Sequence, residues 1–341
     1  MLLKTGFLLG KFMPLHQGHI FLCDLAASMV DRLTILVCTR DCEPIDGQLR
    51  LHWVQQELGH KANVVHLDRD VPQEPSDHPD FWNIWRDLIA EFHPAPIDMV
   101  FGSETYVTKL AQTVSARPFI VDLDRTTVPV SASDIRADPV KHWAHVPPPV
   151  RTHYQKRFCI IGPESCGKTV LAGKLAQDFE TLCIPEYGRQ YDAQFREGTG
   201  WCAEDFVELA TGHMAIADQV ARRAGPVVFE DTDVLQTMVW AKYLLGQVPQ
   251  RLTELSKTKS QRHYILLSPD VPWINDGTRY QNQSSDRLWF FDQCLEFLEN
   301  TQARYDVVSG VNWDDRLAQV REIVKANGAT RLSSDTSLGN P

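Results

Sequence analysis

Hydrophobic residues recur along the chain with two alternating spacings. Short continuous apolar runs are typical of buried parallel strands, whereas apolar residues three and four positions apart are typical of helices that bury one face. The early part of the chain has strand-like runs at 5–10, 33–38, 63–67, 99–103 and 119–123, and helix-like segments at 18–30, 49–58, 82–92 and 104–112. This alternation predicts a doubly wound, parallel α/β sheet.

The same alternation restarts after a proline-rich segment. HVPPPVR at 145–151 contains three consecutive prolines, which lack backbone donors and favour extended polyproline geometry. Beyond it, strand-like runs lie at 157–162, 226–233, 263–268 and 305–310, and helix-like segments at 169–179, 203–222, 234–245, 286–300 and 313–326. We therefore expect two doubly wound α/β domains, at 1–146 and 157–327, joined by a linker at 147–156 and followed by a disordered polar tail at 328–341.

Composition and charge narrow the classes of protein that this chain can be. Its 341 residues suffice for two hydrophobic cores, and its net charge of −10 argues against a basic surface for nucleic acid, so we expect no nucleic-acid partner. The eight cysteines form no C-x-x-C pair, which favours reduced, mostly buried thiols over a zinc site. No secretory signal or membrane segment is evident, so we expect a cytoplasmic protein that binds small molecules, with a homo-oligomer possible.

A pair of histidines follows the first predicted strand. GKFMPLHQGH spans 10–19 and precedes the first predicted helix, the place where a doubly wound sheet binds its ligand. Gly18 lets the backbone come close to a phosphate, while His16 and His19 can donate hydrogen bonds to charge that develops on a transferring phosphoryl group. Lys11 adds a positive charge beside them, and Gly10 and Phe12 belong to the same candidate nucleotide-binding segment.

A second motif, VSASDIR at 130–136, supports this interpretation. We expect a strand that ends in Ser131 and Ser133 ahead of another helix, with the serines capping the helix and Arg136 directed at phosphate oxygens. H-x-G-H followed by S-x-S-x-x-R resembles the signature pair of the nucleotidyltransferase superfamily. That resemblance implies in-line transfer of AMP from ATP, with Mg²⁺, to a phosphate acceptor, and release of pyrophosphate.

A phosphate-binding loop opens the second half of the chain. GPESCGKT at 162–169 matches G-x-x-x-x-G-K-[ST] and lies between a predicted strand and a predicted helix, which is the context that the motif requires. Lys168 is expected to reach the β- and γ-phosphates of ATP, and Thr169 to bind Mg²⁺. The residues expected to surround the phosphates are Gly162, Glu164, Ser165, Cys166 and Gly167.

Two acidic motifs follow the phosphate loop. In EYGR, Glu186 can accept the proton of a substrate hydroxyl and Tyr187 can stack on a flat ring. In DTD, Asp231 can contact Mg²⁺ or act as the base instead of Glu186, and Asp233 is a further candidate for substrate binding. The residue types leave the choice of base open.

A third motif, PWINDGTR at 272–279, lies on a predicted loop. Trp273 is a second candidate for stacking on the substrate, and Asp276 is a candidate polar contact. Arg279 suits a segment that closes over the transferring phosphate.

Taken together, the motifs resemble a fusion of two enzymes. G-K-F-x-P-L-H-x-G-H, I-R-x-x-P, E-Y-G-R, D-T-D and P-W-x-x-D-G-x-R are similar in order and spacing to the NadR type over about residues 5–325. The alternative fusion, a coenzyme A synthase, is less similar. The resemblance implies a Rossmann-like nucleotidyltransferase followed by a P-loop kinase: the kinase converts ribosylnicotinamide and ATP to nicotinamide mononucleotide (NMN), and the transferase joins NMN and ATP to give NAD.

Two further expectations follow from the resemblance. Trp82 and Trp85 match an aromatic patch of the family's first domain, where they would line the nicotinamide pocket or pack in the core. Many members carry an N-terminal helix-turn-helix; here the first strand begins near residue 5, so we expect no repressor function. A module that senses NAD or ATP through a weak or inactive transferase half is the alternative from another class.

Overall fold

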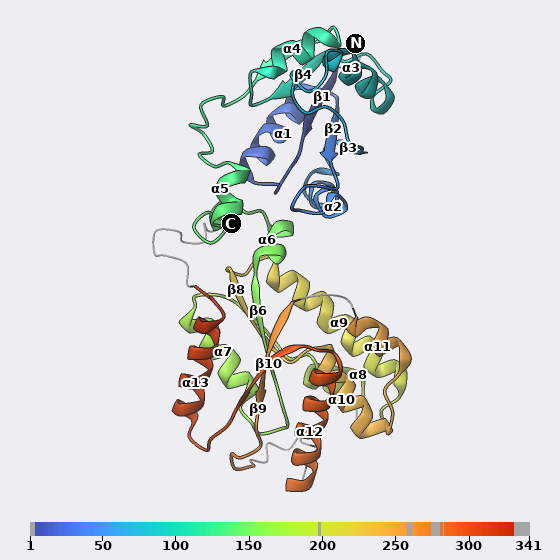
Figure 1. Cartoon of the computed structure of the whole chain (residues 1–341). Helices are drawn as coiled ribbons and strands as arrows, with labels where there is room; N and C mark the ends of the chain where they lie inside the picture. The colour runs from blue at the N-terminus through green and yellow to red at the C-terminus, as the bar shows by residue number, and fades with distance from the viewer. Residues whose placement is uncertain (1–3, 197–198, 258–260, 274–279, 282, 331–341) are drawn as a thin grey trace. The chain divides into compact units, whose positions relative to one another are not determined.

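The computed structural model describes residues 4–196, 199–257, 261–273, 280–281 and 283–330. The chain divides between Val150 and Arg151 into two compact units, here called unit 1 and unit 2. Each unit is built on a five-stranded sheet in which all paired strands are parallel, as Figure 1 shows. The predicted fold class is therefore confirmed in both halves.

Unit 1 has the strand order β3-β2-β1-β4-β5. Its strands are β1 (Thr5–Gly10), β2 (Arg32–Thr39), β3 (Asn63–Asp68), β4 (Met99–Gly102) and β5 (Arg117–Ile120). Its helices are α1 (Gln17–Met29), α2 (Gly47–Leu58), α3 (Phe81–Phe92), α4 (Tyr106–Thr113) and α5 (Ala132–Ala137), with a 3₁₀ turn at Trp143–His145. Because β1 lies between β2 and β4, the order reverses at β1, and a ligand crevice is expected at its carboxyl end.

Unit 2 has the strand order β10-β9-β6-β8-β7. Its strands are β6 (Lys156–Ile161), β7 (Cys183–Ile184), β8 (Val227–Asp231), β9 (Arg262–Leu267) and β10 (Arg304–Val308). Its helices are α7 (Lys168–Asp178), α8 (Gly188–Phe195), α9 (Ala203–Ala221), α10 (Val234–Leu245), α11 (Gln250–Ser256), α12 (Ser284–Asn300) and α13 (Trp313–Ala326). The order reverses at β6, so the phosphate loop after β6 lies at the corresponding crevice.

Successive side chains of β6 are buried on opposite faces of the second sheet, which explains why helices cover both faces. Phe158 and Ile160 belong to a buried cluster with residues of α7 and α13, whereas Cys159 and Ile161 belong to a cluster with residues of α10 and α12. Figure 1 shows these helix pairs on opposite faces of the sheet. A strand buried on both faces has a continuous apolar sequence, which is why RFCII was recognisable.

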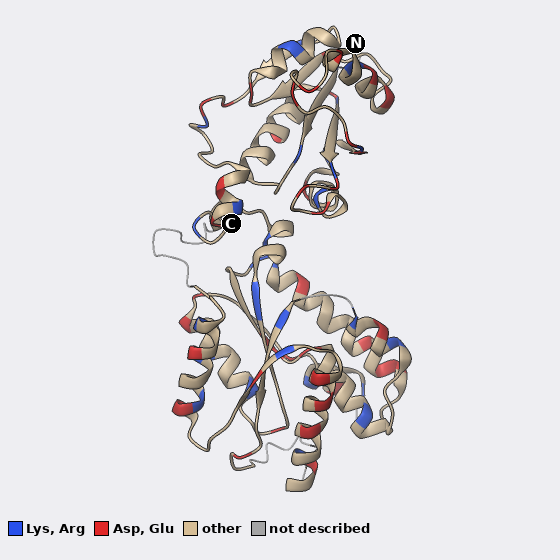
Figure 2. Cartoon of the chain, in the orientation of Figure 1, with Lys and Arg blue, Asp and Glu red and all other residues tan. Residues whose placement is uncertain are grey.

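The second sheet also encloses a buried ion cluster. The carboxylate of Glu230 on β8 is fully buried and accepts from Arg157 on β6 at 2.5 Å and from Arg262 on β9 at 2.8 Å. Figure 2 shows Lys and Arg positions, in blue, on strands of unit 2. Burial alone would raise the pKa of Glu230, but the two guanidinium groups more than offset it and hold that pKa below the usual range.

Two expectations about local structure were wrong, and three short elements were missed. The prolines do not form an extended segment: Pro148–Tyr154 is a helix, α6, because proline is tolerated in a first helical turn, whose N–H groups lack intrahelical acceptors anyway. No strand precedes the serine motif, and α5 begins at Ala132, inside it. The short elements β7, α8 and α11 were not predicted.

In the described part of the chain, no helix is long and apolar enough to span a membrane. Most of the predicted disordered tail, residues 331–341, lies outside the described residues.

Candidate functional site

Unit 1 contains a cavity of about 310 Å³ beyond the carboxyl ends of β4 and β5, at the beginning of α1. It brings together residues of both predicted motifs, namely His16, Gly18, His19, Ser131 and Ser133. The other lining residues are Phe21, Leu22, Ser103, Glu104, Val121, Asp122, Arg125, Val128, Val130 and Ala132. Sequence reasoning gave no role to Ser103, Asp122 or Arg125, which lie outside the motifs.

The two histidines face this cavity as neutral hydrogen-bond donors. His16 caps α1, and its Nδ1 accepts from the backbone N–H of Gly18 at 3.1 Å, which leaves the ring proton on Nε2. The ring of His19 lies over that of His16 with centroids 3.8 Å apart. Burial first, then the charge of Arg125, lowers the pKa of His16 to about 4, and burial followed by His16 lowers that of His19.

Arg136 connects the two motifs of unit 1 instead of lining the cavity. Its guanidinium donates to the carbonyl of Met13, in the histidine motif, and to Oγ of Ser133 at 3.0 Å. Ser131 caps α5, and its Oγ accepts from the N–H of Asp134 at 3.1 Å while Asp134 accepts from the N–H of Ser131. The predicted capping role is thus present at Ser131, whereas Ser133 lies within the helix.

The remaining candidates of the histidine motif are not among the lining residues of the cavity. Lys11 forms an ion pair with Glu43 at 3.3 Å, and Glu43 also accepts from the fully buried Arg50 at 2.7 Å. Gly10 ends β1, and Phe12 is buried with its ring 4.9 Å from that of His19. Phe12 therefore packs against the ring of His19.

The two tryptophans of α3 belong to the hydrophobic core. Trp85 is buried, and its Nε1 donates to the carbonyl of Pro72 at 3.0 Å. Trp82 is half-buried against the same cluster. Neither lines the described cavity, which favours core packing over a place in the nicotinamide pocket.

The phosphate loop of unit 2 has the backbone that its glycines require. Gly162 and Gly167 have φ of +141° and +80°, in the region that side chains rarely adopt. A Cβ on Gly162 would lie 2.7 Å from the carbonyl oxygen of Leu267, and one on Gly167 would lie 2.0 Å from the ring of Trp313. Ser165 has a positive φ of +61°, and the N–H of Gly162 donates to Oε1 of Gln236 at 2.9 Å.

Lys168, Thr169 and Asp231 meet at the end of this loop. The ammonium group of Lys168 donates to the carbonyl of Pro163 at 2.8 Å, and the hydroxyl of Thr169 donates to Oδ2 of Asp231 at 2.5 Å. Asp231 is buried, and within the described residues its Oδ1 has no hydrogen-bond partner. Burial, followed by the charge of Glu186, raises the pKa of Asp231. A hydroxyl and a carboxylate at this place fit a hard cation such as Mg²⁺.

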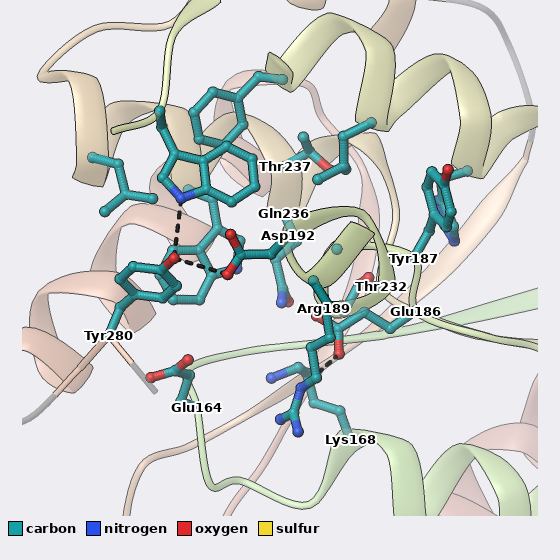
Figure 3. Close-up of a pocket in the computed structure, with 18 residues that line it drawn as sticks. Glu164, Lys168, Glu186, Tyr187, Arg189, Asp192, Thr232, Gln236, Thr237 and Tyr280 are labelled. Carbon is teal, nitrogen blue, oxygen red and sulfur yellow. Dashed lines mark hydrogen bonds and ion pairs between the residues drawn. The ribbon is translucent and has the colours of Figure 1, made fainter. Parts of the chain in front are cut away.

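A cavity of about 490 Å³ adjoins the loop, and Figure 3 shows its walls. It is lined by Glu164, Lys168, Glu186, Tyr187, Gly188, Arg189, Asp192, Ala193, Trp201, Phe206, Leu209, His213, Thr232, Gln236, Thr237, Trp240, Leu244 and Tyr280. Glu186 lies 3.7 Å from the guanidinium of Arg189. Of the predicted residues, Glu164, Lys168, Glu186 and Tyr187 therefore share this cavity.

Aromatic side chains form much of the cavity wall. Trp201, Trp240 and Tyr280 join the predicted Tyr187, and the hydroxyl of Tyr280 donates to Asp192 at 2.9 Å and accepts from Nε1 of Trp201 at 3.2 Å (Figure 3). These contributions were missed because they come from separate elements. Trp240, in α10, has the same helical spacing as a core residue, so the sequence carried no local signal for it.

Two other candidates of unit 2 lie away from the cavity lining. Asp233 is buried: it caps α10 through the N–H of Leu235 at 3.0 Å and accepts from the hydroxyl of Tyr264 at 2.7 Å. Its predicted contact with substrate is thus replaced by a structural role. Trp273 does not line the cavity, and Asp276 and Arg279 lie outside the described residues.

Cys166 is a fully buried member of the loop. Its Sγ accepts from the guanidinium of Arg287 at 3.5 Å, and its carbonyl accepts from that of Arg316 at 3.4 Å. It therefore fixes the loop from the side of the core.

Comparisons with known families agree with this division. A family model described as cytidylyltransferase-like matches residues 7–138, and one described as an AAA domain matches residues 157–316. Two relatives, each named trifunctional NAD biosynthesis/regulator protein NadR, are 29% identical (Salmonella typhimurium) and 30% identical (Escherichia coli strain K12). Both alignments cover 94% of this chain, and they cover 83% and 82% of the relatives.

Two crystal structures share the fold. The NadR protein in complex with NR and the NadR protein in complex with NAD and AMP-PNP align with TM-scores of 0.74 and 0.72. Each is 21% identical to this chain, and each alignment covers 97% of this chain and 98% of the other.

Proposed function

Because this chain belongs to the NadR family, we propose that it catalyses two consecutive steps of NAD biosynthesis. Unit 2 transfers the γ-phosphoryl group of ATP to the ribosyl hydroxyl of ribosylnicotinamide, giving NMN and ADP. Unit 1 then transfers AMP from a second ATP to the phosphate of NMN, giving NAD and pyrophosphate. We assign the activities to residues 157–327 and 1–146. The observation that carries this proposal is that each ATP motif borders a cavity at the reversal point of its own sheet.

In the kinase unit, the geometry supports a division of roles between two carboxylates. Glu186 lines the cavity and is proposed to accept the proton of the attacking hydroxyl, whereas Asp231 is bonded to Thr169 beside the cavity. Thr169 and Asp231 would hold Mg²⁺, which when bound neutralises charge on the phosphates. Lys168 exchanges its bond to Pro163 for a phosphate oxygen, and the aromatic wall of Trp201, Trp240 and Tyr280 receives the flat nicotinamide ring.

In the transferase unit, catalysis rests on positioning and charge stabilisation. The phosphate of NMN attacks the α-phosphorus of ATP directly, so the unit needs no nucleophile of its own. His16 and His19, as neutral donors, stabilise the negative charge on the oxygens of the transferring group. Arg136 positions the histidine motif through the carbonyl of Met13.

The proposal is tested by giving pure protein ribosylnicotinamide, ATP and Mg²⁺ and separating the products by chromatography. NMN and then NAD are expected. His19→Ala is expected to stop the sequence at NMN. Lys168→Ala is expected to abolish NMN formation from ribosylnicotinamide, yet to leave the conversion of supplied NMN to NAD intact, because the two motifs lie in separate units.

The alternatives give different results in the same assay. If NMN accumulates without NAD in the unaltered protein, unit 1 is a sensor and the transferase assignment fails. If phosphopantetheine is adenylylated while NMN is not, the protein acts as a coenzyme A synthase. If no product forms from either pyridine substrate, the proposed function is wrong.

A further inference from the structure

Arg125 places a cationic side chain at the cavity of unit 1, outside both sequence motifs. It lines that cavity together with His16, His19 and Ser133. Within the described part of the chain, its guanidinium has no hydrogen-bond or ion-pair partner, although a guanidinium offers five N–H donors. The two basic motif residues differ in this respect, because Lys11 is paired with Glu43 and Arg136 is bonded to Met13 and Ser133.

The loop that carries Arg125 is held in one conformation by Asp122. The Asp122 carboxylate accepts from the backbone N–H groups of Thr126 at 2.8 Å, Thr127 at 3.0 Å and Val128 at 3.1 Å. The N–H of Arg125 also donates to the carbonyl of Asp122 at 2.9 Å. Both Asp122 and Arg125 have φ of +51°, a left-handed conformation that non-glycine residues keep only where surrounding contacts enforce it. The arginine is therefore presented by a built loop and not by a random surface turn.

The positions of the basic groups suggest which phosphates Arg125 meets. His16 is buried at the start of α1, whereas Arg125, which lines the same cavity, is exposed to solvent. The guanidinium is near enough to contribute, after burial, to the lowered pKa of both histidines. If the two histidines contact the α-phosphate of ATP, the departing β- and γ-phosphates lie nearer to solvent, on the side where Arg125 is exposed.

We propose that Arg125 is a catalytic residue of adenylyl transfer that binds the β- and γ-phosphate oxygens of ATP. This inference rests on the proposed function of unit 1. An NMN phosphate oxygen forms the new bond to the α-phosphorus, and the bond from that phosphorus to the α,β-bridging oxygen breaks. Pyrophosphate leaves with the electron pair of that bond, and the guanidinium stabilises the negative charge that it gains.

The test compares Arg125→Ala, Arg125→Lys and the control Arg117→Ala, in which an exposed arginine of the same unit that does not line the cavity is removed. Arg125→Ala is expected to lower kcat/KM for ATP in NAD formation by about 100-fold, the usual effect of losing one charge-stabilising donor. It is also expected to raise KM for pyrophosphate when the reaction is run from NAD and pyrophosphate, with little change in KM for NMN. Arg125→Lys should recover part of the loss, because lysine keeps the charge but not the forked donors. Arg117→Ala should match the unaltered protein.

Asp122 gives a second, independent test as a positioning residue. Asp122→Ala keeps the arginine in the sequence but removes three hydrogen bonds that hold its loop, so it should lower the same kcat/KM. Adding Arg125→Ala to this variant should lower kcat/KM little further. The kinase activity of each variant, measured on the same chain, reports whether the protein is folded.

Several results overturn the inference. Unchanged ATP and pyrophosphate kinetics in Arg125→Ala do so, as does an equal loss in Arg117→Ala, which would indicate general charge steering. A rise confined to KM for NMN would place the arginine on the acceptor instead. If the unaltered protein itself forms no NAD from NMN, the failure belongs to the proposed function and not to Arg125.

Discussion

Arg287 of α12 is predicted to set the shape of the phosphate loop from its buried side. Its Nε donates to the carbonyl of Glu164 at 3.2 Å, its Nη1 to the carbonyl of Val271 at 3.1 Å, and its Nη2 to Sγ of Cys166 at 3.5 Å. The residue is 5% exposed, so water cannot readily replace these bonds. Two of its three contacts are with the loop itself.

Arg287→Met keeps most of the side-chain volume and removes the donors. Each hydrogen bond from a charged group contributes about 1.5–3 kcal/mol, and the part-buried carbonyl of Glu164 and the buried carbonyl of Val271 would lose their bonds to this group. Removing the buried charge also removes its desolvation cost, so we expect a net loss of about 2–4 kcal/mol in the stability of unit 2. If ATP must restore the loop at a free-energy cost of about 1.4 kcal/mol, its binding to the kinase weakens tenfold.

The assay measures KM for ATP and for ribosylnicotinamide in NMN formation, the thermal unfolding of the protein, and NAD formation from supplied NMN. We expect KM for ATP to rise at least about tenfold, KM for ribosylnicotinamide to change little, and the transferase activity to stay the same. Arg321→Met is the matched control, because Arg321 pairs with Asp178 between α13 and α7 and does not touch the loop. A variant that unfolds at a lower temperature but keeps its KM for ATP would refute the reasoning, since Arg287 would then be structural only.

Three further predictions concern other contacts. Trp240→Ala should raise KM for ribosylnicotinamide by about 10–100-fold without affecting NAD formation from NMN, as expected for loss of an aromatic wall; an unchanged KM would remove Trp240 from the substrate site. The imidazole of His16 should stay neutral at about pH 5.5 in an NMR titration, because burial and then Arg125 lower its pKa to about 4; a midpoint near 6.5 would contradict the donor role. The pKa of Glu230 is depressed in the folded state, so its contribution to the free energy of unfolding is complete above about pH 4.5 and is lost as the pH falls through the lowered value. Glu230→Gln should lower the stability of unit 2 at neutral pH and reduce the fall in stability at acid pH, as measured by chemical denaturation at a series of pH values.

Among the described residues, the sequence predicted every strand of the two sheets except β7, because parallel strands that are buried on two faces are continuous apolar runs. The expected strand at 33–38 corresponds to β2, and the expected helix at 234–245 has the bounds of α10. The prediction failed where an element was too short for a pattern or where the same residues are compatible with two structures. The two residues of β7 are too few for a pattern, and three prolines can begin a helix as well as prevent one.

The site was predictable only as far as its residues are contiguous. The phosphate loop and the histidine motif are local sequences, so both were found. Trp201, Trp240 and Tyr280 reach one cavity from separate segments, and each alone resembles an ordinary core or surface residue. Arg125 lies in the polar stretch LDRTT, which in one dimension is indistinguishable from a solvated loop.

Membership of a motif and contact with substrate are therefore different properties in this chain. Arg136 ends the serine motif, yet its donors are engaged by Met13 and Ser133, so it holds two segments in register. Asp233 belongs to DTD and caps a helix instead of lining the cavity. Conversely, Arg125 belongs to no motif but lines the cavity of unit 1. Substituting Arg136 should therefore raise KM for both substrates of the transferase, because the histidine loop moves. Substituting Arg125 should change the kinetics of ATP and pyrophosphate alone. This contrast distinguishes a residue that positions the site from one that contacts the reacting groups.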